Sequence, residues 1–162
     1  MLLEKIKNNR KIILIILAII ILVIIDQVAK ALVVGQEKNI INENIKIVKM
    51  DSYNGAFGMG QNDTVTFVIA NIVVIGIILK FMKTQESQID KKTYIALTFI
   101  IAGAIGNLID KIFKGYVVKC ISIYSIPFNI ADVLMIVGWV LLALFFAIHT
   151  IKLKNKKEDK IE

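Results

Sequence analysis

The sequence predicts an all-α membrane protein with four transmembrane helices and a small extracytoplasmic β-cradle. Of the 162 residues, 57% are hydrophobic, and the mean hydropathy is +0.72. A soluble domain of this length could not bury so much apolar surface. Four apolar stretches approach or reach the roughly 20 residues with which a helix crosses a bilayer. They cover about residues 12–34, 65–82, 93–109 and 131–151.

The positions of the basic residues predict how these helices are oriented. Of the 20 Lys and Arg residues, 13 lie in the amino-terminal tail, around the linker between the second and third stretches, and in the tail at 152–162. Basic segments next to membrane spans stay in the cytoplasm, so both termini are expected inside. The net charge of +7 then reflects topology and attraction to anionic lipid heads, and it predicts no nucleic-acid partner.

The remaining residues are expected to form one domain, 1–162, with two segments outside the membrane at 36–64 and 111–128. Apolar and polar residues alternate roughly over Asn39–Met50, which predicts short strands at the membrane surface between the first two helices. Glycines at 55, 58 and 60 then interrupt regular structure before the second helix begins.

The first apolar stretch is expected to be a retained helix. It is about twice as long as the roughly 7–15 apolar residues of a signal-peptide core, and no small-x-small cleavage site follows it.

The cysteine and histidine counts argue against two kinds of site. The single cysteine, Cys120, has no partner for an internal disulfide, and with the single histidine, His149, it does not make a zinc-ligand pattern. No metal and no cofactor are therefore expected.

Three carboxylates are the strongest functional candidates, because an ionisable residue in a membrane helix is costly and is by default functional. With the topology above, Asp26, Asp110 and Asp132 all lie near the outer ends of helices, at similar depth. Two neighbouring carboxylates cannot both ionise cheaply, so one holds a proton while the other stays charged. Asp110 and Asp132 are therefore predicted to act as a general acid and base that activate water.

Structural roles are open for the same aspartates. Asp110 could be an interfacial residue beside Lys111 in contact with water, and Asp132 could be the amino cap of the last helix. The residues alone leave these alternatives standing.

Neighbouring polar residues are predicted to support the two aspartates. Asp26 and Lys30 are four residues apart and share a helix face, so they are expected either to neutralise each other or to brace the outer segment or the catalytic pair. Asn107 and Asn129 each precede an aspartate by three residues, so each is expected to hydrogen-bond that aspartate or the substrate backbone. Gly106, like Gly103, is expected to permit close helix packing.

Together these motifs resemble those of the lipoprotein signal peptidases (signal peptidase II), four-helix aspartyl proteases of the bacterial cytoplasmic membrane. The resemblance covers nearly the whole chain. Its motifs are Asp26-Gln-Val-Ala-Lys30, Gly103-Ala-Ile-Gly-Asn-Leu-Ile-Asp110 and Phe128-Asn-Ile-Ala-Asp132. The last two end in the aspartates that the resemblance marks as catalytic, and Ala131 belongs to the third motif.

The resemblance implies a substrate, a site and an inhibitor. Such enzymes remove the signal peptide from prolipoproteins, just before a cysteine that already carries diacylglycerol. The active site would face the extracytoplasmic side beneath the β-cradle, and globomycin would bind in the same cleft. The expected partners are the prolipoprotein substrate and membrane lipid, and nothing in the sequence requires more than a monomer.

The sequence departs from the family pattern at three places. The family's Asn-x-Gly-Ala-Ala-Phe run is here Tyr53-Asn54-Gly55-Ala56-Phe57-Gly58, one residue shorter, with Asn54 and Gly55 as substrate-binding candidates. The arginine that usually follows the first aspartate is Lys111, which loses the bidentate fork. The family's Val-Val-Asp-Phe reads Val117-Val118-Lys119-Cys120, which puts a base where the family has an acid.

Two other functions compete with the peptidase. A catalytically weak lipopeptide- or lipoprotein-binding paralogue on the same fold would fit the change at Lys119. A small proton or ion carrier would need an acid at mid-membrane, whereas the acids here cluster near one face.

Overall fold

The computed structural model describes residues 2–33, 37–41, 44–52, 64–85 and 89–158. Its helices are α1 (Leu2–Leu32), α2 (Thr64–Thr84), α3 (Lys91–Lys114) and α4 (Ile130–Glu158), and its strands are β1 (Glu37–Ile41), β2 (Ile45–Ser52), β3 (Val117–Ile123) and β4 (Ile126–Phe128). Each helix contains a segment long and apolar enough to cross a membrane. The predicted fold class, four spanning helices with a small β-structure, is confirmed.

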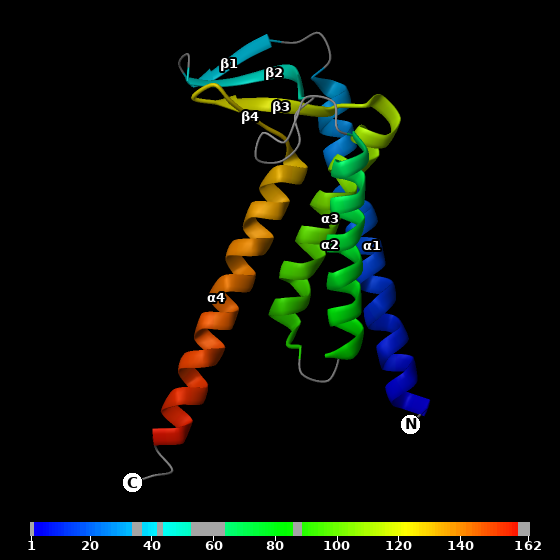
Figure 1. Ribbon diagram of the computed structural model, residues 1–162, viewed down its shortest axis with the longest axis vertical. Coiled ribbons are helices and arrows are strands. Elements are labelled where there is room, and N and C mark those ends of the chain that lie inside the picture. The colour runs from blue at the N-terminus through cyan, green and yellow to red at the C-terminus, as the bar shows by residue number, and fades with distance from the viewer. Residues whose placement is uncertain (1, 34–36, 42–43, 53–63, 86–88, 159–162) are drawn as a thin grey trace.

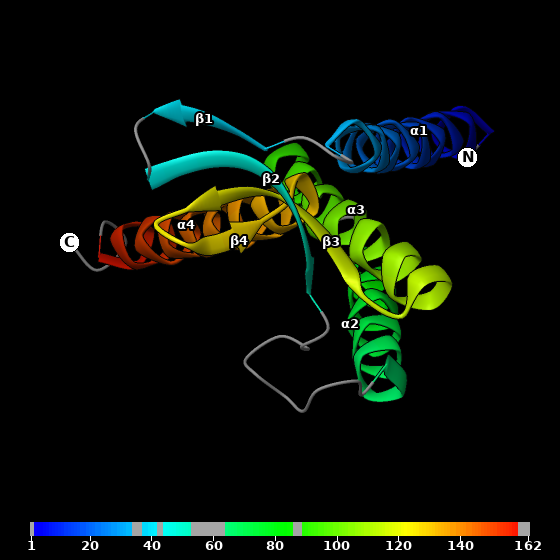
Figure 2. The ribbon, with the colours of Figure 1, turned by 90° about the horizontal axis from the view of Figure 1, so that it is seen from above.

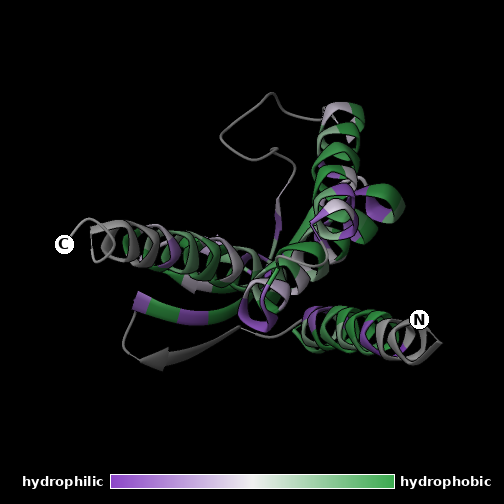
Figure 3. Cartoon of the chain, turned by 90° about the horizontal axis from the view of Figure 1, so that it is seen from below, coloured by the Kyte–Doolittle hydropathy of each residue, from purple (hydrophilic) through white to green (hydrophobic). Residues whose placement is uncertain are grey.

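The helices form a bundle with the sheet at one end. α1 begins and α4 ends at the opposite end of the bundle (Figure 1). Seen from above, α3 runs between the other three helices (Figure 2), and it packs against each of them. Of the spanning window of α3, 67% is buried, against 6%, 6% and 11% for α1, α2 and α4. The helices consist mostly of hydrophobic residues (Figure 3), and many large hydrophobic side chains on them are exposed, as lipid contact requires.

Small residues let α4 approach α3 closely. A Cβ added to Gly138 of α4 would lie 2.6 Å from Cγ1 of Ile100 and 2.8 Å from the carbonyl oxygen of Ala96, both on α3, and a Cβ at Gly103 would meet the Ala131 carbonyl oxygen. Close backbone approach of this kind is how membrane helices pack without a hydrophobic driving force. The expectation for Gly103 thus matches the packing, and α4 adds a third glycine.

The ends of α3 are closed by local hydrogen bonds. Asp90 caps its first turn, accepting a hydrogen bond from the Thr93 amide at 2.8 Å, and this bonding with Thr93 lowers the pKa of the Asp90 carboxyl. At the other end Gly115 adopts a left-handed φ of 79° and its amide bonds the Lys111 carbonyl, a conformation that glycine adopts without strain. α3 therefore extends to Lys114, one turn past the predicted end at 109.

The sheet draws on both outer segments. It is antiparallel in the order β1-β2-β3-β4, so the segment predicted as an outer loop, 111–128, supplies the end of α3 and half of the strands. A two-residue turn joins β3 to β4, with positive φ at Tyr124 (48°) and Ser125 (67°), as a tight hairpin requires. The prediction placed strands only between the first two helices and missed β3 and β4. In β3 the buried residues Val118, Cys120 and Ser122 alternate with less buried neighbours.

Candidate active site

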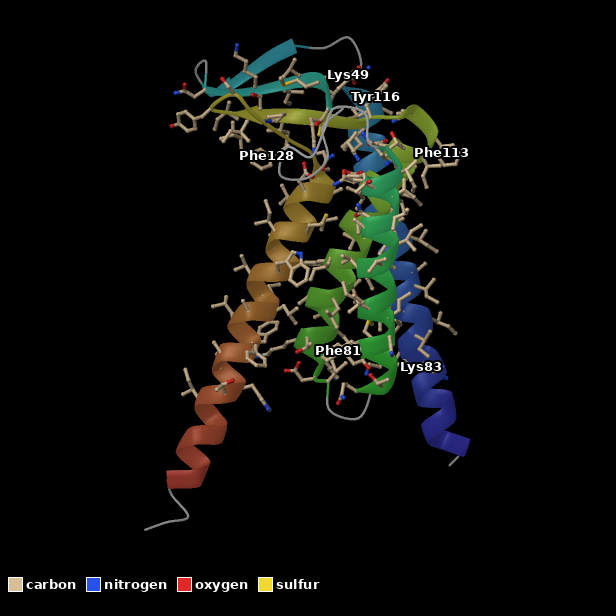
Figure 4. All side chains as sticks on the ribbon, viewed as in Figure 1. Lys49, Phe81, Lys83, Phe113, Tyr116 and Phe128 are labelled. Atoms are coloured by element: carbon tan, nitrogen blue, oxygen red, sulfur yellow. The ribbon has the colours of Figure 1, made fainter. Side chains whose placement is uncertain are left out.

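Beneath the sheet, the ends of α1, α3 and α4 that lie nearest to it bring charged side chains together (Figure 4). The ion pairs there join three carboxylates, Asp26, Asp110 and Asp132, to three lysines, Lys30, Lys114 and Lys119. Burying an isolated charge is very costly, so charges inside a protein are paired and hydrogen-bonded. The cluster satisfies that requirement, because each of its three carboxylates is paired with at least one lysine.

Asp26 and Lys30 tie α1 to both of the helices that carry the other two aspartates. The Lys30 amine lies 2.5 Å from Oδ2 of Asp26 and 2.8 Å from Oδ2 of Asp110. The second oxygen of Asp26 accepts a hydrogen bond from the Ala131 amide in the first turn of α4, at 2.8 Å. The two expectations for this pair, mutual neutralisation and bracing of the aspartates, therefore hold together in the geometry.

The side chains of Asp26 and Lys30 of α1 contact α3 at Gly106. A Cβ there would lie 2.8 Å from Oδ2 of Asp26 and 3.2 Å from Cβ of Ala131. The carbonyl oxygen of Gly106 accepts hydrogen bonds from Gln27 at 3.0 Å and from Lys30 at 3.4 Å. The glycine thus leaves room for a carboxyl, and its carbonyl binds the neighbouring donors.

Asp110 is enclosed completely, with 0% of the residue exposed. Its carboxyl is bound by Lys30, by Lys114 at 2.8 Å from the next turn of α3, and by the Val118 amide of β3 at 3.2 Å. Lys111 is buried as well, at 1% exposure, with its amine 5.8 Å from the centre of the Phe67 ring. The alternative that Asp110 contacts water at the interface is therefore wrong.

Asp132 belongs to a reciprocal cap at the start of α4. Its amide donates to Oδ1 of Asn129 at 2.7 Å, and its carboxyl accepts from the Asn129 amide at 3.0 Å. This is the geometry of a capping box, which satisfies two otherwise unpaired amides at once. The amino-cap position, which was one alternative for Asp132, is therefore held by Asn129. Asp132 is the third residue of the helix, and its carboxyl accepts the second hydrogen bond of the box.

The Asp132 carboxyl is the accessible one of the two predicted catalytic groups. Its side chain is 19% exposed, and it pairs with Lys119 of β3, 14% exposed, at 2.6 Å. Its other oxygen accepts a hydrogen bond from the side-chain amide of Asn107 at 3.0 Å. Asn107 was expected to bond either the aspartate three residues after it or the substrate backbone, but it reaches across to α4.

A short chain of hydrogen bonds links the two aspartates without direct contact. Asn129 donates to the Asn107 side-chain oxygen at 2.8 Å and to the Val118 carbonyl at 2.9 Å, while the Val118 amide bonds Asp110. Among the described residues, no hydrogen bond joins the carboxyls of Asp110 and Asp132, and every buried side-chain polar atom has a partner. Each carboxyl is instead paired with lysine, Asp110 with Lys30 and Lys114 and Asp132 with Lys119.

Three groups that contact the ionic cluster were not predicted from the sequence. Gln27, Lys114 and the backbone of Val118 all contact the cluster. Only Lys114 carried a signal, since it follows Asp110 by four residues on one helix face. The candidates Asn54 and Gly55 lie outside the described residues.

Cys120 is a buried free thiol on β3. Burial raises the pKa of the Cys120 thiol, which favours an inert, uncharged side chain. Within the described ranges, no three His, Cys, Asp or Glu residues are grouped as metal ligands.

Fold and site together define a four-span membrane protein with a buried ionic cluster beneath a surface sheet. The family model described as Signal peptidase (SPase) II matches residues 17–148. The chain therefore belongs to the signal peptidase II family, a family of peptidases.

Individual relatives agree with this assignment. A lipoprotein signal peptidase from Clostridium novyi is 37% identical over 123 residues, covering 72% of this chain and 82% of the relative. One from Fusobacterium nucleatum is 35% identical over 127 residues, covering 74% and 77%. A bacterial membrane enzyme structure, determined by the in meso method at 2.3 Å resolution, superposes with a TM-score of 0.76 at 27% identity, covering 84% of this chain and 88% of that one.

Proposed function

We propose that this protein removes the signal peptide from diacylglyceryl-modified prolipoproteins in the bacterial cytoplasmic membrane. The observation that carries the proposal is the partly exposed Asp132 carboxyl, held at the start of α4 by the Asn129 cap, in a chain that belongs to the signal peptidase II family. The lipid-bearing cysteine of such a substrate would lie in the outer leaflet, and the cluster lies at the sheet end of the bundle.

The proposed reaction is hydrolysis with Asp110 and Asp132 as the catalytic carboxylates. One carboxylate takes a proton from water as the oxygen attacks the peptide carbonyl carbon. The carbon–nitrogen bond then breaks, the hydroxyl stays on the acyl product, and the leaving amine receives a proton from the site. The partly exposed side chain of Asp132 is the group that the water and the substrate would meet first.

The remaining candidates would support this chemistry without a cofactor. The relative positions of α1, α3 and α4 would be held by Asp26, Lys30, Gly106 and Ala131. Asn107 and Asn129 would orient the Asp132 carboxyl. Lys111, Asn54 and Gly55 are proposed to contact substrate or the sheet. The active site would face the extracytoplasmic side, and the working unit would be a monomer in lipid.

A gel-shift assay tests the proposal with the detergent-solubilised full chain and a purified diacylglyceryl prolipoprotein. Loss of the signal peptide increases the mobility of the substrate. Asp132→Asn and Asp110→Asn should each lower the cleavage rate by about 100-fold or more, as loss of a positioned acid or base does. Asp51→Asn, which changes an exposed carboxyl on β2, should leave the rate unchanged. Wild-type rates in both variants would refute the two-aspartate mechanism.

One observation favours a second candidate function. The Lys119–Asp132 ion pair occupies the accessible carboxyl, as expected of a paralogue that binds lipoprotein precursors and hydrolyses them weakly. Stoichiometric binding of the prolipoprotein without turnover would separate this candidate from the peptidase.

A further inference from the structure

We propose that two exposed aromatic side chains, Phe113 and Tyr124, anchor the sheet end of the bundle in the headgroup layer of the lipid bilayer. One anchor is the last turn of α3, and the other is the turn between β3 and β4. The partner is the lipid surface itself. This contact goes beyond the proposed function, which assigns neither residue a role.

Both aromatic side chains are exposed to an extent that needs a partner outside the chain. Phe113 is 80% exposed and Tyr124 is 72% exposed, and each has an exposed isoleucine close by in sequence, Ile112 or Ile126. Among the described large hydrophobic residues, none is more exposed than Phe113. A single exposed hydrophobic residue is ordinary, whereas grouped ones mark a surface that contacts a protein or a membrane.

The backbone at Tyr124 is a second, independent observation. Tyr124 and Ser125 have φ values of 48° and 67°, in the left-handed region, where a two-residue hairpin turn usually carries Asn-Gly or Asp-Gly. An aromatic residue is uncommon in that region, and strain of this kind is typical of functional positions. The Tyr124 amide donates to the Asn44 carbonyl at 2.8 Å, which holds the turn in place. A contact outside the chain accounts for a large aromatic residue at a turn that disfavours one.

The two anchors lie on opposite flanks of the bundle. The β3–β4 turn extends outward over the start of α4, and the end of α3 extends to the other side (Figures 1 and 2). Phe113 lies on that other side (Figure 4). It belongs to the last turn of the span Lys91–Lys114, and β4 leads directly into the span Ile130–Ile151. Both anchors therefore continue lipid-contacting helix surfaces toward the headgroups.

The chemistry of an aromatic ring fits this level of the membrane. Tyrosine is enriched where hydrocarbon meets water, because its ring is apolar and its hydroxyl forms hydrogen bonds. Phe113 supplies the apolar ring alone. Water reaches the headgroup layer, so a turn at this level remains accessible to polar reagents from outside.

Two anchors on opposite flanks fix the depth and tilt of the sheet, whereas one anchor would allow the sheet to rock. The ionic cluster lies beneath the sheet, between the two flanks (Figure 4). Its depth is then held near the headgroups, where a lipid-bearing cysteine would present its peptide bond. This consequence rests on the proposed function, but the lipid contact does not.

Depth-dependent fluorescence quenching tests the lipid contact. The only tryptophan, Trp139, is replaced in a Trp139→Phe background. Single tryptophans are then introduced as Phe113→Trp, as Tyr124→Trp and, for a control, as Asp51→Trp at the exposed ion pair of β2. Each full chain is reconstituted into phosphatidylcholine vesicles that carry bromine either close to the headgroup or near the ends of the acyl chains.

The lipid contact predicts a definite order of quenching. Phe113→Trp and Tyr124→Trp should lose fluorescence mainly to the shallow bromines and should emit at shorter wavelength than Asp51→Trp. Native Trp139, near the middle of its span, should lose fluorescence mainly to the deep bromines, and Asp51→Trp should be quenched by aqueous iodide instead.

Two outcomes would overturn the lipid contact. One is that Phe113→Trp and Tyr124→Trp are quenched by bromine no more than Asp51→Trp. The other is short-wavelength emission from these variants without bromine quenching, which would assign the surface to a second copy of the chain.

Cleavage in vesicles tests the consequence for the site. The double variant Phe113→Ser, Tyr124→Ser should have a higher KM for vesicle-embedded diacylglyceryl prolipoprotein than wild type, with kcat unchanged, because neither residue belongs to the ionic cluster. A wild-type KM would show that the anchors do not set the depth of the site. If folded wild type cleaves nothing, the proposed function fails, and the quenching experiment still decides the lipid contact.

Discussion

The carboxyl of Asp26 accepts a hydrogen bond from the Ala131 amide at 2.8 Å, across 105 residues of sequence. It connects the sheet end of α1 to the residue that precedes Asp132 in α4. Since Lys30, one turn away, pairs with Asp110, a single turn of α1 positions both of the aspartates that are proposed to be catalytic.

Removing the Asp26 carboxyl should destabilise the bundle strongly. Asp26→Ala leaves the Ala131 amide without its acceptor and Lys30 with one carboxylate fewer in a buried site, and losing one partner of a buried pair costs about 3 kcal/mol or more. Asp51→Ala, which breaks an exposed pair with Lys49, should cost at most about 1 kcal/mol. Unfolding in detergent measures both, and equal midpoints for the two variants would contradict the bracing role of Asp26.

A methyl group at position 106 should be harmful, whereas the same change at position 76 should not. In Gly106→Ala the added Cβ meets Asp26 and Ala131, and overpacking of this kind costs about 1–3 kcal/mol. Gly76 of α2 has nothing within 4 Å of an added Cβ, so Gly76→Ala should be neutral or stabilising through helix propensity. Thermal unfolding and the prolipoprotein gel shift should both rank Gly106→Ala below Gly76→Ala, and the reverse order would show that this close approach is not required.

The cap at Asp90 should make the stability of α3 sensitive to acid. Its hydrogen bonds with Thr93 lower the pKa of Asp90 below 3.8 in the folded protein. A lowered pKa contributes stability above the unfolded value, and that contribution disappears as the pH falls through the folded value. Asp90→Asn keeps a capping oxygen but no charge.

The stability difference between wild type and Asp90→Asn should therefore be constant near neutral pH and shift against wild type below about pH 4. The effect is small because the carboxyl is exposed to solvent. Melting temperatures of the two proteins over this range measure it, and parallel curves throughout would show that the carboxylate form adds nothing to the cap.

The membrane orientation predicts opposite labelling at the two ends of the bundle. Tyr124, in the exposed β3–β4 turn, is expected outside the cell, and Lys83, at the other end of the bundle (Figure 4), is expected inside. In a Cys120→Ser background, Tyr124→Cys should react with an impermeant maleimide on intact cells, whereas Lys83→Cys should react only after lysis. Labelling of Lys83→Cys on intact cells would reverse the predicted topology.

The helices and the common depth of the three aspartates could be predicted because both depend on local hydrophobicity and on the distribution of basic residues along the chain. Apolar runs define spans, and the basic segments predict on which side Asp26, Asp110 and Asp132 lie. The Asp26–Lys30 pair follows from helical spacing alone. These predictions need no knowledge of how one helix is rotated against another.

The partners across elements could not be predicted because they depend on helix rotation and strand register. Asn107 bonds Asp132 because the close packing of α3 and α4 turns it toward α4. Lys119 reaches Asp132 because the β3–β4 hairpin, in which Ile121 pairs with Phe128, brings the start of α4 next to β3. The sequence marked Lys119 as a departure from the family pattern, but only the register of the sheet shows which acid it meets.

The pairing of Lys30 also bears on the order in which the protein is made. α1 emerges from the ribosome first, whereas the α3 groups that Lys30 binds are synthesised later, its acceptor Gly106 lying 76 residues further on. During that interval the nascent α1 must enter the membrane with two charges near its carboxyl-terminal end. Asp26, one turn from Lys30, provides a counter-ion within the same helix, so α1 can be inserted before the rest of the bundle exists.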